Sequence, residues 1–318
     1  MTTKSDRYKG ALVSVLCGDA LGAPYETWGA KSIQQDLAKR GGLVPFDYLD
    51  PWKRGGIFPK GRPTDDSDHT AALAQSLVAC RGVDQADIFL RLRNVTFEHK
   101  SPLWDGKAVG AGSTMRKMLR PTTWRESQAL GCDGAFPSNG SLMRAAPLAL
   151  FFGSAGTVCS HIVRDASEVT HRHPLATECC IAYSIVLAGL LEGREPVDCI
   201  ASAHMRVMDA ELVAVLHDPT SPPRDPEVWP GRGAALLTLH VALYALMRAR
   251  TFRDGLTEVV AVGGDTDTYG AVAGGLLGAR FSINAIPSEW KDILIGRSVM
   301  EDAAHRLLHI ACKEGYML

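Results

Sequence analysis

Hydrophobic positions along the chain recur at helical spacing, and alternating strand patterns are scarce. Near the N-terminus, Leu12, Val15 and Leu16 share one helical face, which predicts a helix over residues 7–21. Further helices are predicted over residues 71–79, 176–191 and 234–250, through Leu256, Val259 and Val260, and after residue 290. No segment repeats at the spacing of a repeat protein. The pattern predicts an all-α fold, with residues 1–318 forming a single compact domain.

Segments rich in glycine and proline interrupt these helices. Residues 41–63 contain two Gly-Gly pairs and four prolines, which predicts an irregular loop. Long loops without structure of their own are often functional. Residues 218–233 are also rich in proline and predict a surface loop or a lid.

Composition excludes several classes of protein. A length of 318 residues with 46% hydrophobic residues permits a large core. The net charge of −1 indicates no nucleic-acid or membrane partner, and no apolar run approaches the about 18 residues of a membrane span. Eight cysteines without a Cys-x-x-Cys pair predict free buried thiols in a reducing cytosol. With no signal peptide, we expect a cytoplasmic protein, and we expect it to be a monomer.

Candidate chemistry is densest in the segment from Val262 to Gly270. Asp265 and Asp267 alternate with threonines after a pair of glycines, and a small, apolar run over residues 271–279 predicts a tightly packed helix. Such hard oxygen ligands suit Mg²⁺ or Mn²⁺ better than Zn²⁺. The alternative is helix capping, because Asp and Thr favour that position.

A second oxygen-rich segment comes just before the predicted helix 71–79. Thr64, Asp65 and Asp66 are followed by Ser67-Asp68-His69. Two such helix entrances, far apart in the chain, could converge on one ion or an ion pair. Whether they converge depends on the fold.

Two turns offer backbone amides. Residues 110–114 place glycines before Ser113 and Thr114 at a helix start, where N–H groups can meet an anion. No strand precedes them, so the segment is neither a P-loop nor a dinucleotide fingerprint, and a helix cap is the alternative. Residues 138–140 form a Ser-Asn-Gly turn, which is either a plain turn or an anion cradle.

His171 and His173 precede the predicted helix 176–191. Two histidines could contribute to a zinc site, but no cysteine or third histidine has suitable spacing. A helix cap is the alternative for either ring.

Together these segments resemble the ADP-ribosylglycohydrolase family of the dinitrogenase-reductase-activating type. The resemblance spans nearly the whole chain, in the family's order. It rests on Gly18-Asp19-Ala20-Leu21-Gly22 with Glu26, Thr64-Asp65-Asp66, residues 110–114, the Asn139-Gly140-x-x-Met143-Arg144-x-x-Pro147 pattern, Thr170-His171, and Gly263-Gly264-Asp265-x-Asp267-Thr268.

The resemblance implies an all-α fold with a two-metal site where helix and loop ends converge. The implied cofactors are two divalent cations, Mg²⁺ or Mn²⁺, and the implied catalytic residues are Glu26, Asp66 and Asp265. The implied metal ligands are Thr64, Asp65, Asp66, Asp265, Asp267 and Thr268. The implied substrate-binding residues are Glu26, Gly110, Gly112, Ser113, Thr114, Ser138, Asn139, Gly140 and His171. Asp19 is expected to be structural and Arg144 to brace acids from within.

The implied reaction is hydrolysis of the glycosidic bond between the distal ribose of ADP-ribose and a protein side chain of the arginine or serine type. The partner is then an ADP-ribosylated protein, and ADP-ribose is the product. The alternatives are a relative that binds ADP-ribose without cleaving it, a hydrolase of another ADP-ribose derivative, and an all-α phosphohydrolase. The last usually carries His-Asp ligand pairs, and outside the candidate site the one such adjacency is His217-Asp218.

One segment departs from the family pattern. After Thr-Asp-Asp the family commonly continues with a hydroxyl, then Gln, Glu or a similar residue, then an apolar one, whereas this chain has Ser67-Asp68-His69. An extra acid and an imidazole beside the metals would tune the choice of ion or leaving group.

Overall fold

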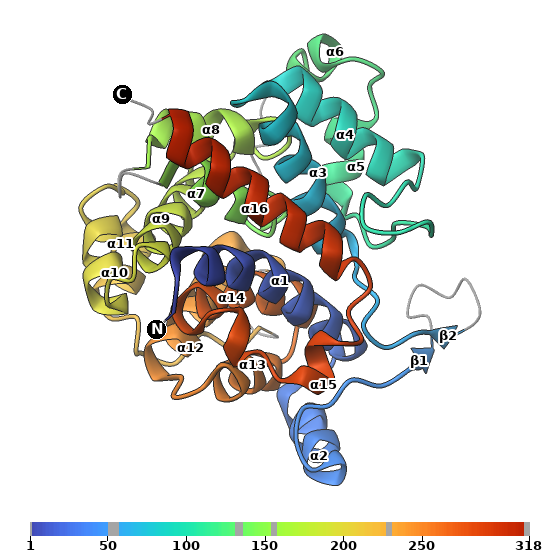
Figure 1. Cartoon of the computed structure of the whole chain (residues 1–318), viewed down its shortest axis with the longest axis vertical. Coiled ribbons are helices and arrows are strands. Elements are labelled where there is room, and N and C mark those ends of the chain that lie inside the picture. The colour runs from blue at the N-terminus through green and yellow to red at the C-terminus, as the bar shows by residue number, and fades with distance from the viewer. Residues whose placement is uncertain (1, 50–56, 131–135, 154–157, 227–230, 315–318) are drawn as a thin grey trace.

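The computed structural model describes residues 2–49, 57–130, 136–153, 158–226 and 231–314. These residues form α-helices and one small hairpin (Figure 1), which confirms the predicted all-α class. The helices are α1 (Lys4–Gly22), α2 (Ala30–Arg40), α3 (Asp65–Cys80), α4 (Gln85–Phe97), α5 (Ser113–Leu119), α6 (Trp124–Gln128), α7 (Ala146–Phe152), α8 (Ser160–Glu168), α9 (Pro174–Leu191), α10 (Pro196–His204), α11 (Ala210–His217), α12 (Ala235–Arg248), α13 (Phe252–Ala261), α14 (Thr266–Phe281), α15 (Ser288–Lys291) and α16 (Arg297–Glu314). Short 3₁₀ turns, η1 (Ala23–Tyr25) and η3 (Ile283–Ala285), follow α1 and α14.

Two buried helices from opposite ends of the chain, α1 and α14, run antiparallel in backbone contact at the centre (Figure 1). A Cβ built on Gly18 would lie 1.8 Å from the carbonyl oxygen of Gly270, so only glycine permits this approach. The same contact recurs one turn apart along both helices, at Gly10 with Gly278, Ser14 with Gly274, and Gly22 with Thr266. The small residues in 271–279 therefore explain the tight packing that the sequence predicted.

This contact places the end of α1 beside the start of α14. The hydroxyl of Thr266 donates a hydrogen bond to the carbonyl oxygen of Gly22 over 2.8 Å. The segment that follows α1 carries Glu26, and the segment that opens α14 carries Asp265 and Asp267. The central helix pair thus brings Glu26 close to Asp265 and Asp267, although they lie far apart in the sequence.

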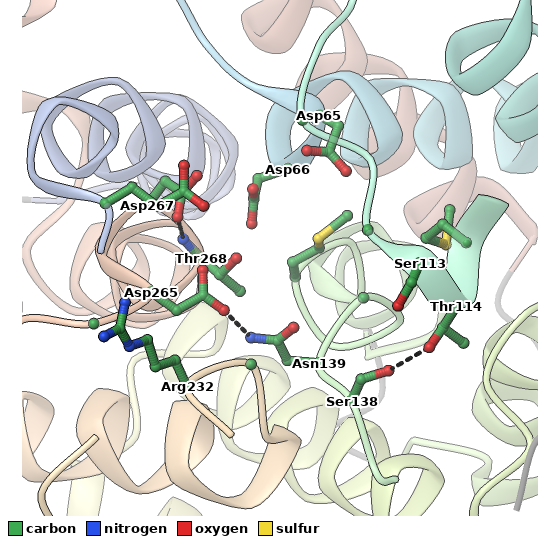
Figure 2. Close-up of a pocket in the computed structure, with 18 of the residues that line it drawn as sticks. Asp65, Asp66, Ser113, Thr114, Ser138, Asn139, Arg232, Asp265, Asp267 and Thr268 are labelled. Atoms are coloured by element: carbon green, nitrogen blue, oxygen red, sulfur yellow. Dashed lines mark hydrogen bonds between the residues drawn. The ribbon is translucent and has the colours of Figure 1, made fainter. Parts of the chain in front are cut away.

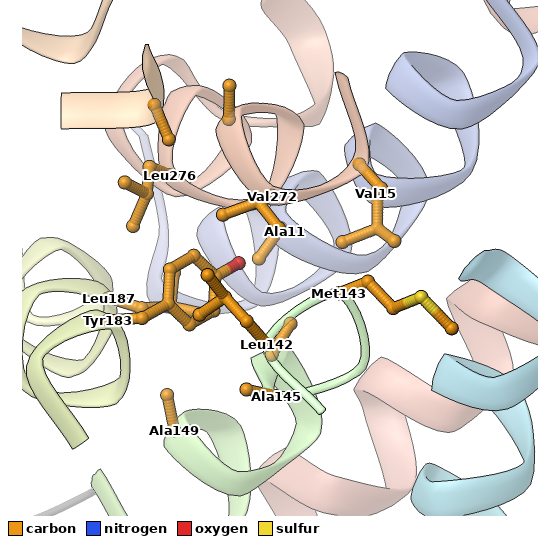
Figure 3. Close-up of a cluster of buried hydrophobic side chains, with 14 of the residues drawn as sticks. Ala11, Val15, Leu142, Met143, Ala145, Ala149, Tyr183, Leu187, Val272 and Leu276 are labelled. Carbon is orange, nitrogen blue, oxygen red and sulfur yellow. The ribbon is translucent and has the colours of Figure 1, made fainter. Parts of the chain in front are cut away.

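The other helices surround this pair. α16 packs on α1, α3 and α7, while α12 and α13 pack on α14. Buried side chains fill the space between α1, α7, α9 and α14, where Val15, Leu142, Tyr183 and Val272 lie together (Figure 3). α3 packs on α1, α14 and α4, and backbone N–H groups at its start donate to Asp19 of α1, so its acidic start lies beside the central pair.

α9 is a long and apolar helix. Its 18 residues have a mean hydropathy of 1.7, long and apolar enough by length and composition to cross a membrane, so the expectation that no run approaches that length was wrong. Of the same window, 78% is buried inside the fold, against α7, α8, α10, α12 and α14. Packing inside the fold accounts for its apolar composition.

Other local expectations also need correction. The loop 41–63 contains a hairpin, in which β1 (Tyr48–Leu49) pairs antiparallel with β2 (Ile57–Phe58). α3 begins at the acidic motif itself and not after it. Cys17, Cys179, Cys180 and Cys199 are buried and free, whereas Cys80 and Cys312 are exposed. Predictions at residues 50–56, 132 and 227–230 lie outside the described residues.

Candidate active site

Nearly every residue predicted for the site lines one cavity of about 540 Å³. The predicted residues that line it are Glu26, Asp65, Asp66, Gly110, Gly112, Ser113, Thr114, Ser138, Asn139, Gly140, His171, Asp265, Asp267 and Thr268. The acids lie on one side and the hydroxyl-bearing turns on the other (Figure 2). The fold therefore brings together, around one cavity, motifs that the sequence placed at the ends of separate helices.

The acidic wall begins at the N-terminus of α14. Asp265 occupies the N-cap position but its side chain makes no capping bond, so capping does not explain this acid. It accepts instead a 2.8 Å hydrogen bond from the side-chain amide of Asn139. Glu26, Asp265 and Asp267 each have a carboxylate oxygen within 4.8 Å of the others. Three converging carboxylates form a group that could hold a metal ion.

The Gly-Gly pair before α14 brings Glu26 to this group. Gly263 and Gly264 have φ angles of 80° and 86°, a left-handed conformation that glycine adopts without strain. The Thr27 N–H donates to the Gly264 carbonyl over 2.7 Å, and the Gly264 N–H donates to the Trp28 carbonyl over 2.9 Å. This short pairing fixes the loop that carries Glu26 against the loop that carries Asp265.

Asp19 holds the start of α3 from inside the core. This fully buried carboxylate accepts bonds from the backbone N–H and hydroxyl groups of both Thr64 and Ser67, which agrees with the structural role expected for it. Thr64 caps α3, and its hydroxyl contacts Asp19 and Asp66. Of the predicted site residues, Thr64 alone does not line the cavity, and its role as a ligand stays a prediction.

The side of the cavity formed by the start of α3 offers an oxygen with no partner among the described residues. Oδ1 of Asp66 is buried and accepts no hydrogen bond in the described part of the chain. Asp65 lies beside it, with its carboxylate toward the same cavity (Figure 2). A buried carboxylate oxygen without a donor is costly, and a cation at this wall would satisfy it.

Crowding of acids shifts their protonation. Burial, then the charges of Asp265 and Asp19, raise the pKa of Glu26 to about 7, while Arg232 opposes the shift. Burial and neighbouring carboxylates likewise raise the pKa values of Asp65, Asp66 and Asp267 well above the ordinary range. These acids cannot all be ionised at neutral pH without positive charge between them, which is the situation a divalent cation relieves.

The two residues that depart from the family pattern point away from the cavity. Asp68 accepts a 2.5 Å hydrogen bond from the Ser101 hydroxyl, and burial raises its pKa to about 7. The ring of His69 is fully buried, with Nε2 3.2 Å from the Thr96 hydroxyl and Nδ1 3.5 Å from Asp65. Burial lowers the pKa of His69 to about 3, so the ring is neutral. His69 therefore packs behind Asp65, and Asp68 does not add a ligand to the cavity wall.

The opposite wall is built from the two glycine-containing turns. Gly110 has a φ of 116°, and a Cβ there would lie 2.0 Å from Oδ1 of Asp65, so this turn lies directly against the acid. Gly112 has open space around its Cβ position. The Ser138 hydroxyl donates to the Thr114 hydroxyl over 3.2 Å and joins the two turns (Figure 2). Small residues thus leave room for a ligand between acids and turns.

Several lining residues were missed by sequence reasoning. Met143 lies in the quoted Asn139–Pro147 pattern without an assigned role, and Phe136 comes shortly before it. Thr27, Met115, Gly233 and Gly264 are loop or helix neighbours of predicted residues. Arg232 is the missed cation: it lies near Asp265 and Asp267 (Figure 2), with Nη1 3.4 Å from the Thr27 carbonyl. It belongs to the segment 218–233 predicted as a loop or lid, and no local pattern sets it apart from other arginines.

Two further expectations are settled by contacts. In the described residues, no metal-like group includes His171 or His173; His173 instead caps α9 by accepting from the Leu175 N–H. Arg144 does not brace acids, because it donates to the Gly140 carbonyl and the Thr170 hydroxyl. Because neither histidine belongs to such a group, the zinc alternative has no geometric support in the described part of the chain.

Comparison with known proteins supplies the deciding observation. The sequence profile that describes ADP-ribosylglycohydrolases matches residues 1–315. The chain belongs to the ADP-ribosylglycohydrolase family. The resemblance seen in the sequence motifs is thereby confirmed.

Named relatives of this ADP-ribosylglycohydrolase cover most of its length. ADP-ribosyl-[dinitrogen reductase] glycohydrolase of Rhodospirillum rubrum is 28% identical over 90% of this chain and 89% of its own. ADP-ribosylarginine hydrolase Tri1 of Pseudomonas putida is 26% identical over 90% and 73%, and ADP-ribosylhydrolase ARH3 of Danio rerio is 27% identical over 96% and 91%. A solved structure named ADP-ribosylglycohydrolase-related protein complex has a TM-score of 0.79 at 29% identity, covering 98% of this chain and 100% of that one.

Proposed function

We propose that this ADP-ribosylglycohydrolase removes ADP-ribose from modified protein side chains and uses two divalent cations, Mg²⁺ or Mn²⁺. The observation that carries the proposal is the shape of the cavity: acids from three separate segments face it on one side, and two amide-rich turns face it on the other. The family supports the removal of ADP-ribose from modified substrates. The metal requirement and the linkage are our proposals.

The residues present fit a pair of divalent cations. Asp65 and Asp66 would hold one ion from α3, and Asp66 offers the buried oxygen that has no partner among the described residues. Asp265, Asp267 and Thr268 would hold the other from α14. When bound, such ions would polarise sugar hydroxyls and help to activate water. All these ligands are oxygens, which favours Mg²⁺ or Mn²⁺.

Acidic side chains of the protein would stabilise the developing charge and accept a proton. Cleavage of the glycosidic bond builds positive charge on the distal ribose, and the carboxylates of Asp265 and Asp267, ionised once cations are bound, would lie beside it. Asp265 keeps its orientation through the 2.8 Å bond from Asn139. Glu26, whose pKa burial raises to about 7, is suited to take a proton from the attacking water near neutral pH.

Glycine and hydroxyl groups would position the nucleotide. A cavity of about 540 Å³ lies in the ordinary range for small-ligand sites. Residues 110–114 and 138–140 would contact the ribose and diphosphate through backbone amides and hydroxyls. The relatives' names include an arginine linkage and a dinitrogen reductase; we propose a protein substrate of the arginine or serine type. Every predicted acidic ligand is present, which favours hydrolysis over binding alone.

The decisive experiment measures release of ADP-ribose from peptides modified on arginine and on serine. We expect release with Mg²⁺ or Mn²⁺ and loss of release after EDTA treatment and dialysis. Asp267→Asn should lower the rate at least about 10²-fold, the scale of removing one catalytic group.

The matched control is Asp68→Asn, because Asp68 is another buried acid on this end of the fold that does not line the cavity. We expect this variant to retain most of the activity. Full turnover in EDTA would remove the metal from the proposal. Absence of release from both peptides under every metal condition would favour a binding-only relative.

A further inference from the structure

Arg144 is a buried cation without a carboxylate partner in the described part of the chain. Its side chain is 1% exposed. Nη1 donates to the carbonyl of Gly140 and lies 3.5 Å from Sδ of Met115, and Nη2 donates to the Thr170 hydroxyl over 2.7 Å. Burial lowers the pKa of the Arg144 guanidinium to about 10, so it stays charged near neutrality. A buried charge with only neutral partners is expensive, which indicates a role beyond packing.

Arg144 reaches the cavity wall directly at Gly140 and, through Thr170, at His171. Gly140 lines the cavity, and the ring of His171 lies against it: a Cβ on Gly140 would be 2.8 Å from Nε2 of His171. Nδ1 of the same ring lies 2.7 Å from the Thr170 hydroxyl. The order of contacts is therefore Arg144, Thr170, His171 and then the cavity.

The hydrogen bonds in this series determine the tautomer of His171. Arg144 has only donors, so Thr170 Oγ1 accepts from it. If the Thr170 hydroxyl donates its own hydrogen to Nδ1 of His171, both groups are satisfied and the ring proton lies on Nε2. If the proton lay on Nδ1, the hydroxyl hydrogen of Thr170 would have no acceptor among the described residues, at a position that is 0% exposed. Buried donors are rarely left unpaired.

We propose that Arg144 and Thr170 are positioning residues that hold His171 as its Nε2–H tautomer. The ring then presents a hydrogen-bond donor to the cavity, next to the Gly140 turn. The group it recognises must be an acceptor, and the guanidinium behind the wall favours an anionic one. In ADP-ribose that group is a phosphate oxygen, an assignment that rests on the proposed function, whereas the tautomer does not.

The tautomer can be read directly from ¹⁵N shifts of the histidine rings in the ligand-free protein, where protonated and unprotonated ring nitrogens differ widely. The His171→Phe variant identifies the His171 signals by their loss. We expect Nε2 to carry the proton in the parent protein. Thr170→Val keeps the shape of the side chain but removes the donor to Nδ1, and it should give a substantial Nδ1–H population and weaken ADP-ribose binding by about tenfold.

Thr177→Val is the matched control. Thr177 is a buried threonine on α9 whose hydroxyl has no hydrogen-bond partner among the described residues, so this variant should change neither the tautomer nor the affinity. A parent protein with the proton on Nδ1 would overturn the inference, whether or not Thr170→Val folds. A Thr170→Val protein with an altered tautomer but unchanged ADP-ribose affinity would overturn the role in recognition. If the parent protein binds no ADP-ribose, the proposed function fails, while the spectrum still decides the tautomer.

Discussion

Replacing Gly18 by Ala tests whether the contact between α1 and α14 controls the geometry of the site. The added Cβ would lie 1.8 Å from the Gly270 carbonyl oxygen, and real Cβ contacts essentially never fall below 3.0 Å. The difference, 3.0 − 1.8, requires the two backbones to separate or tilt by about 1.2 Å. No flexible side chain can absorb this change, because both contacting segments are helical backbone.

The expected effects on stability and activity differ in size. Overpacking costs about 1–3 kcal/mol, and the better helix propensity of Ala offsets about 1 kcal/mol of that. The stability loss is therefore modest. In contrast, Glu26 follows α1 and Asp265 precedes α14, so a shift of about 1 Å between them should lower the catalytic rate by about 10²-fold.

The assay compares kcat/KM for ADP-ribose release with the free energy of unfolding from urea denaturation, on the same preparations. Gly189→Ala is the control, because its Cβ would lie 2.5 Å from Sγ of Cys199, between α9 and α10, away from the residues that line the cavity. It should lose stability without losing activity. A Gly18→Ala protein with the parental kcat/KM would refute the reasoning.

Three further predictions follow from the cavity. Glu26→Gln should lower kcat by about 10²-fold, because the amide cannot accept the proton, and should leave ADP-ribose affinity nearly unchanged. Calorimetry and kinetics on one preparation check this. A parental rate would show that the other acids deprotonate the attacking water. Gly112→Trp should abolish ADP-ribose binding without loss of stability, since a Cβ there meets nothing within 4 Å; Gly112→Ala is its control, and parental affinity in the Trp variant would place the ligand elsewhere. Burial raises the pKa of Glu26 to about 7 and those of Asp65, Asp66 and Asp267 well above the usual range. The metal-free folded protein therefore binds more protons than the unfolded chain. Its free energy of unfolding should fall as the pH rises from about 4 to 7. The proposed site would bind Mn²⁺ through the ionised acids, so the rise in Tm with Mn²⁺ should be larger at about pH 8 than at about pH 5.5. An equal rise would show that the acids are not its ligands.

The sequence by itself determined the class of fold and most of the chemistry. Apolar periodicity is a local property, and it located α9 to within two residues and α1 to within three at either end. The acids and turns were recognisable for the same reason, because each motif is a short run whose residue types indicate their ligand preference. Even the tight packing of α14 was visible in its glycines.

Tertiary structure decided which of these residues meet. Asp66 and Asp68 are two residues apart on the same helix, yet only Asp66 lines the cavity, because α3 turns its other side toward Ser101. Arg144 was expected among acids and lies instead behind His171. Such contacts join residues from distant segments, and they depend on how many side chains pack at once. Local periodicity records which face of a helix is buried, but it does not record which other helix covers that face.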